Sequence, residues 1–168
     1  MDVIQALSEG KRGSVARSNE VARYILQYPD EVRQLVNALA AENPAVVSHV
    51  SHACVSIFAQ EPAVLRPFGA ELLEALKESS QWELLHQLPK ILPHLDLDAV
   101  QLTGLSDRLW HLLKNDRSSI VRTCALQALV DMAETDEKFE PRACAAMAFA
   151  FEQGSKALQA RARNLLKL

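Results

Sequence analysis

Three histidines have the spacing of a candidate metal site. His49 and His52 are three residues apart, which places them on one face of a helix, and His86 follows His49 by 37 residues. On neighbouring helices, the three imidazoles could converge on a metal ion. Zinc, however, requires a fourth ligand position and supporting carboxylates, and packed helices lie about 10 Å apart. We therefore expect no metal and no cofactor, and interpret these histidines as solvated or peptide-contacting side chains.

Other residue types that could carry out a reaction are not arranged for one. The sequence has no Gly-rich phosphate loop, no nucleophile elbow and no paired carboxylates at a defined junction. The three cysteines are widely separated and form no CxxC pair. We interpret Cys54, Cys124 and Cys144 as reduced, buried thiols of a cytoplasmic protein. The chain is expected not to be an enzyme.

Charge and hydropathy limit the class of partner. The 168 residues carry a net charge of -3, so nucleic-acid backbones are weakly repelled. The longest apolar run, residues 143–151, is too short to span a bilayer, and the N-terminus lacks the pattern of a signal peptide. We therefore expect a protein or peptide partner, with no membrane and no nucleic acid.

Apolar residues indicate an all-α fold with an internal repeat. They recur at spacings of three and four nearly from end to end, and this pattern repeats with a step of 37 residues. The repeat defines units 28–64, 65–101, 102–138 and 139–168, each an antiparallel helix pair, after an irregular N-terminal helical cap at 1–27. Because each pair must bury its apolar stripes against its neighbours, the sequence predicts a right-handed α-solenoid of about four pairs. Three of the apolar columns are Val47, Leu84, Val121 and Leu158; Leu35, Leu72, Leu109 and Ala146; and Val55, Leu92, Leu129 and Leu166.

The segment "LLKNDRSSIVRTCALQAL" resembles the second half of a HEAT repeat, in which a turn Asp precedes a Val-Arg pair and apolar residues at helical spacing. The resemblance implies a HEAT-like scaffold. Its sharp motif occurs once, because the other units have Ser48, Leu85 and Gln159 at the position of Arg122, so armadillo-type and other helical repeats remain alternatives. Arg122 is predicted to bond Asp116 or carbonyl groups of a neighbouring unit.

Two enzyme groups with HEAT-like folds supply the alternative functions. Deoxyhypusine hydroxylase holds iron on repeated His-Glu pairs, but this chain contains no His-Glu dipeptide. The HEAT-like alkylpurine DNA glycosylases work in a basic concave groove, whereas here Arg161, Arg163 and Lys167 cluster only near the C-terminal end. A nucleic-acid-binding or DNA-repair protein and a His-liganded metal-binding protein are the alternatives to a protein-binding module.

The second helices of the units are predicted to line a concave groove for a protein or peptide. Helix geometry turns one strip of residues away from the core, and Trp82 is added as a binding anchor or a helix-cap contact. The strip is almost free of Lys and Glu, as is typical of an interface core. Its residues are His49, His52, Ser56, His86, Pro89, Pro93, Thr123, Leu126, Val130, Ala160 and Arg163. The two prolines also predict a kink in their helix.

The last unit is predicted to have a second interface. The outward positions of its first helix are Ala145 and Ala148, and Phe151 stands where earlier units have Lys77 and Lys114. Because a terminal unit should be polar outside, this helix is expected to be covered by a second copy of the chain, giving a homodimer, or by a partner.

Overall fold

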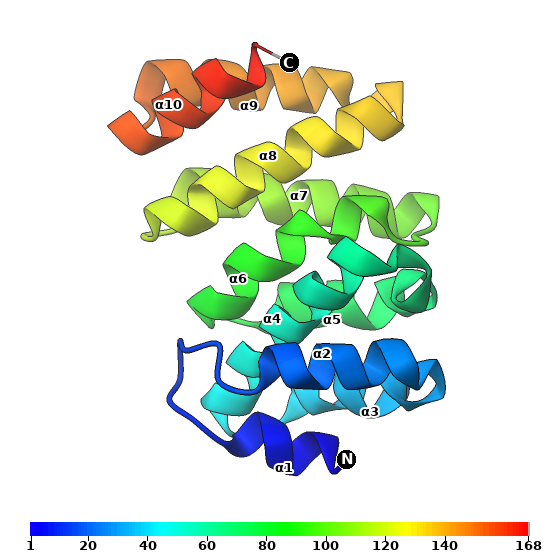
Figure 1. Cartoon of the computed structure of the whole chain (residues 1–168). Helices are drawn as coiled ribbons and strands as arrows, with labels where there is room; N and C mark the ends of the chain where they lie inside the picture. The colour runs from blue at the N-terminus through cyan, green and yellow to red at the C-terminus, as the bar shows by residue number, and fades with distance from the viewer. Residues whose placement is uncertain (168) are drawn as a thin grey trace.

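The computed structural model describes residues 1–167 and confirms the all-α prediction. In these residues there are ten α-helices, joined by turns and short 3-10 segments, and no strand (Figure 1). None of these helices is long and apolar enough to cross a bilayer. The helices are α1 Val3–Ser8, α2 Ser18–Gln27, α3 Val32–Asn37, α4 Pro44–Gln60, α5 Gly69–Glu78, α6 Trp82–Gln87, α7 Ala99–Asn115, α8 Ser119–Thr135, α9 Glu140–Gln153 and α10 Lys156–Leu165.

The helices lie in two rows. In one row α2 packs against α4, α4 against α6, α6 against α8, and α8 against α10. In the other row α1 contacts α3, α5 contacts α7, and α7 contacts α9. Figure 1 shows that the N-terminus and the C-terminal helix α10 lie at opposite ends of this stack. A single hydrophobic cluster, with buried members from Val3 to Ala162, runs between the rows.

Local capping residues set where the longer helices begin. The Asn43 side chain accepts a hydrogen bond from the Ala45 N–H at 2.9 Å, and Pro44 occupies the first turn of α4, where no N–H is needed. Asp98 and Gln101 form a reciprocal capping box at the start of α7. These caps use only residues close to each helix start, so the local sequence specifies where α4 and α7 begin.

The apolar columns of the predicted repeat are largely buried. Every member of the column from Leu35 to Ala146 is fully buried, and the members of the column from Val47 to Leu158 are at most 7% exposed. In the third column Leu92 and Leu129 are buried, but Val55 is half-buried and Leu166 is 69% exposed. Leu166 is the C-cap residue that directly follows α10.

The predicted interruption at the two prolines is confirmed. After α6 the chain continues as two 3-10 turns, Leu88–Lys90 and Leu92–His94, with Pro89 and Pro93 inside them. Proline lacks the N–H that a continuous helix requires and clashes with the preceding turn. The change from α-helix to 3-10 turns also changes which residues face the core, so Pro89 and Pro93 of the predicted strip are buried.

Candidate functional site

A segment of the chain itself covers part of the predicted groove, beside His49 on α4. Residues 9–17, which we call the N-terminal strap, connect α1 to α2 and reach α4 and α6 (Figure 1). Arg12 Nε and Nη2 donate to the two carboxylate oxygens of Glu83 on α6, at 2.6 and 3.0 Å. The Gly13 N–H donates to Ser48 Oγ on α4 at 3.4 Å. A partner could therefore reach this part of α4 only by displacing the strap.

His49 holds the start of the strap. The prediction that it belongs to an accessible strip is therefore wrong. Its ring is fully buried, with Nδ1 2.8 Å from the Leu7 carbonyl oxygen and Nε2 3.2 Å from the Lys11 carbonyl oxygen. Because the ring is buried with each nitrogen against a backbone carbonyl oxygen, neither nitrogen is accessible to a metal ion. Its function in this structure is to anchor the backbone that follows α1.

Three further residues of the predicted strip are also buried, so their outward placement is wrong. Pro89 and Pro93 face the core because the 3-10 turns change the helical phase, and Lys90 and His94 are exposed instead. Leu126 is fully buried because α8 has neighbours on several sides, including α6, α7, α9 and α10. A helix with neighbours on several sides buries more of its circumference than a helix with one buried face and one exposed face.

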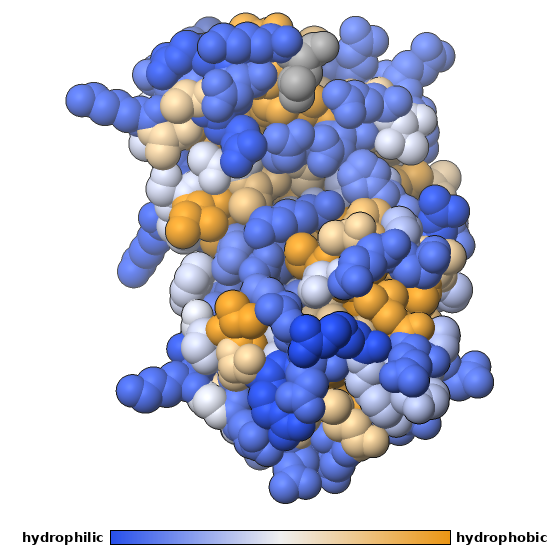
Figure 2. Space-filling view, viewed as in Figure 1, coloured by the Kyte–Doolittle hydropathy of each residue, from blue (hydrophilic) through white to orange (hydrophobic). Residues whose placement is uncertain are grey.

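The remaining strip residues do reach the surface. Trp82 and Arg163 are exposed, and the others are half-buried: His52, Ser56, His86, Thr123, Val130 and Ala160. Between them lie polar side chains that were not predicted. Gln127 Nε2 donates to Asp131 Oδ1 at 2.8 Å, and His94 Nε2 lies 3.6 Å from Asp131 Oδ2. Figure 2 accordingly shows a mostly hydrophilic face with separate apolar patches rather than one apolar strip.

One aromatic side chain stands out on this face. Trp82 is 42% exposed and its ring stacks on that of His86, with centroids 4.9 Å apart and planes 15° apart. Beside it, a small cavity of about 100 Å³ is also lined by Val15 of the strap and by His52. Burial lowers the pKa of His52 and of His86, and the nearby charge of Lys90 lowers both further. Both rings are therefore biased towards the neutral form, which adds no charge beside the indole.

The structure gathers no metal site from the predicted candidates. Within residues 1–167, no three His, Cys, Asp or Glu side chains lie close enough to hold a metal ion. The cysteines differ from their predicted uniform burial: Cys54 is buried, Cys124 is half-buried and Cys144 is exposed. Burial raises the pKa of the Cys54 thiol to about 12 and raises that of Cys124 as well. Both thiols are thus poor nucleophiles near neutral pH.

The Arg122 side chain binds a backbone carbonyl group. Arg122 Nε donates to the Leu113 carbonyl oxygen on α7 at 2.8 Å, so it binds a carbonyl within its own helix pair rather than Asp116.

On α9, Ala145 and Ala148 are exposed and Phe151 is 36% exposed. The predicted apolar surface of this helix is therefore present, and no described segment covers it.

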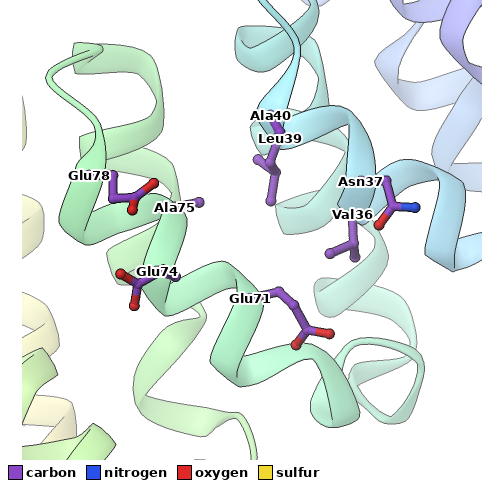
Figure 3. Close-up of a pocket in the computed structure, with 8 residues that line it drawn as sticks. All are labelled: Val36, Asn37, Leu39, Ala40, Glu71, Glu74, Ala75 and Glu78. Atoms are coloured by element: carbon purple, nitrogen blue, oxygen red, sulfur yellow. The ribbon is translucent and has the colours of Figure 1, made fainter.

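A groove that was not predicted lies on the other row of helices. A groove of about 470 Å³ separates α3 from α5 (Figure 3). Its acidic wall comes from Glu71, Glu74 and Glu78. The spacing of these glutamates was a readable signal, since positions i, i+3 and i+7 share a helix face. The apolar wall could not be read from the sequence, because it depends on how α3 sits beside α5.

Comparison of the chain with protein-family models, with curated protein sequences and with solved structures gave no match. The site is therefore interpreted from its own geometry.

Proposed function

We propose that this chain is a non-enzymatic scaffold that binds a protein or peptide partner in the cytoplasm. The binding surface is the exposed part of the second-helix row, centred on Trp82 at the edge of the strap. This proposal replaces a continuous groove with a smaller surface, because the strap covers the predicted groove at His49 and because Pro89, Pro93 and Leu126 are buried.

The observation that carries the proposal is the fixed, exposed indole of Trp82. Stacking on His86 restrains the ring, so little conformational entropy would be lost when a partner packs against it. Tryptophan is among the residues most often found to dominate binding energy at protein interfaces. Two ionisable groups of this region are held in structural contacts: Glu83 pairs with Arg12, and His49 faces two carbonyl oxygens. These contacts support a non-enzymatic role.

We further propose that the helix pairs are HEAT-like and form a right-handed solenoid with a 37-residue repeat. The burial of equivalent positions in successive pairs and the row contacts of α2, α4, α6, α8 and α10 support this architecture. A homodimer through α9 belongs to the same proposal, and the exposed Ala145, Ala148 and Phe151 support it.

Affinity purification from the native cell tests the proposed function. Wild-type protein, Trp82→Ala and Val100→Ala would be immobilised in parallel and the retained proteins identified by mass spectrometry. Val100 is 81% exposed on α7, so its replacement controls for general loss of apolar surface. We expect a partner that is retained by wild type and by Val100→Ala but lost with Trp82→Ala. Identical protein sets from all three baits would refute the Trp82 surface.

A further inference from the structure

We propose that the groove between α3 and α5 binds a basic, amphipathic helical segment of a partner protein. Trp82 lines neither of the two cavities that form this surface, so the inference goes beyond the proposed function and does not depend on it. The argument rests on the shape of the groove, its apolar floor and its acidic wall.

The groove is long enough for about two turns of a bound helix. A second cavity of about 240 Å³ shares Leu39, Ala75 and Glu78 with the 470 Å³ cavity, so the two adjoin, and we call them together the channel. Along α5 the channel extends from Glu71 to Glu78, which corresponds to about 10 Å at the rise of an α-helix. On the α3 side the six-residue helix is followed by the 3-10 turn Ala38–Ala40, which brings Leu39 and Ala40 to the channel.

The floor of the channel is apolar. Val36 and Leu39 come from the α3 side and Ala75 from α5, and Figure 3 shows these side chains directed towards the space between the two helices. Leu39 and Ala75 are only half-buried, so apolar surface remains open to solvent. A leucine-sized side chain of a partner would remove this surface from water, as in other complexes where a helix binds in a groove.

The wall of the channel has negative charge available for a cation. At one end Arg33 Nη1 lies 2.7 Å from Glu71 Oε1, and this pairing lowers the pKa of Glu71, so that carboxylate is ionised but already neutralised. Glu74 forms a long ion pair with Lys77 of its own helix, with 3.8 Å between Glu74 Oε2 and Lys77 Nζ. Glu78 forms no ion pair within residues 1–167. Figure 3 shows the Glu74 carboxylate directed away from α3, so Glu78 is the exposed carboxylate that lines the channel without an ion pair in this part of the chain. Its charge, with that of Glu74 nearby on the same helix, complements a helix with Lys or Arg beside its apolar face.

Fluorescence anisotropy at low salt provides the test. The probe is a labelled helical peptide of leucine and lysine with about four turns, and its control replaces lysine with glutamate. The charge variant is Glu74→Gln with Glu78→Gln, and its matched control is Glu134→Gln with Glu137→Gln, which removes the same charge at exposed positions elsewhere. The shape variant is Ala75→Gln, which projects a neutral side chain into the channel, and its control is Ala70→Gln on the exposed side of α5.

We expect the basic peptide to bind and the acidic peptide not to bind. The charge variant and Ala75→Gln should each weaken binding by about tenfold or more, and both controls should change it by less than about twofold. Equal weakening by the charge variant and its control would mean diffuse attraction to the negatively charged chain and would overturn the proposal. An unchanged affinity of Ala75→Gln would also overturn it, because the peptide would then lie outside the channel. Self-association lost only in the charge variant would identify a second copy as the occupant instead.

Discussion

At the scale of single residues, the close approach of α5 to the turn before α7 depends on Gly69. A Cβ atom at this position would lie 2.7 Å from the Asp96 carbonyl oxygen, which is closer than van der Waals contact allows. We expect Gly69→Ala to lower the free energy of unfolding by about 1–3 kcal/mol, the usual cost of overpacking. Thermal denaturation would measure the loss.

Gly104 supplies the opposite control for this experiment. It lies inside α7, where an added Cβ would meet only the flexible end of Lys77 at 3.3 Å. Gly104→Ala should therefore raise the free energy of unfolding by about 0.5–1 kcal/mol, because alanine loses less backbone entropy in a helix. Equal effects of the two replacements would contradict the close approach at Gly69.

The ion pair between Arg12 and Glu83 makes docking of the strap depend on pH. The Glu83 side chain is only 5% exposed. Burial raises its pKa, but the hydrogen bonds and charge of Arg12, together with hydrogen bonds from the Glu83 N–H and from Gln81, outweigh burial, and the net pKa lies below the usual value. A carboxyl with a lowered pKa stabilises the folded form above its unfolded pKa of about 4.3, and this stabilisation is lost as pH falls through the folded pKa. We therefore expect the strap to be docked near neutral pH and to open in acid.

Hydrogen exchange of the Gly13 and Ser14 amides would measure strap opening. Arg12→Ala should lower the free energy of opening by about 1–3 kcal/mol near neutral pH, because it leaves a nearly buried carboxylate without its partner. Lys11→Ala, at an exposed neighbouring position, should change it little. Glu83→Gln should remove the pH dependence below about pH 5; a persistent acid effect in that variant would assign the dependence to another group.

At the scale of elements, each helix pair depends on apolar contacts with its neighbours. Leu92, in a 3-10 turn, and Leu129, in α8, are at most 1% exposed, whereas Leu166 of the same column is 69% exposed. We expect Leu92→Ala and Leu129→Ala to cost about 2–5 kcal/mol each in urea denaturation. Leu166→Ala should cost less than about 0.5 kcal/mol. Nearly neutral effects of the first two would show that the 37-residue columns do not describe the core.

At the scale of the whole molecule, the exposed side of α9 determines the expected oligomeric state. Phe151 is 36% exposed beside the exposed Ala145 and Ala148. If a second copy covers this surface, light scattering should give the mass of two chains for wild type and of one chain for Phe151→Lys, because a charge in an apolar interface is costly to desolvate. Val100→Lys, on exposed α7 surface, is the matched control. A wild-type protein with the mass of one chain would exclude the dimer.

The sequence by itself determined the helical character of the chain, most of its buried columns and the break at Pro89 and Pro93. These features depend on local physics: apolar periodicity, side-chain caps and the missing N–H of proline. The same local reasoning placed Trp82, His52 and Arg163 on the surface, where the structure has them.

Only the tertiary structure decided which part of the second-helix row is open. Arg12 meets Glu83 across 71 residues of sequence, and His49 meets the backbone of Leu7 and Lys11, so the strap covers a face that the helical period had marked as accessible. Periodicity gives the phase of a helix but not the number of its neighbours. Leu126 is buried for this reason, and the channel between α3 and α5 is open for the same reason, because both depend on how separate helices pack in space.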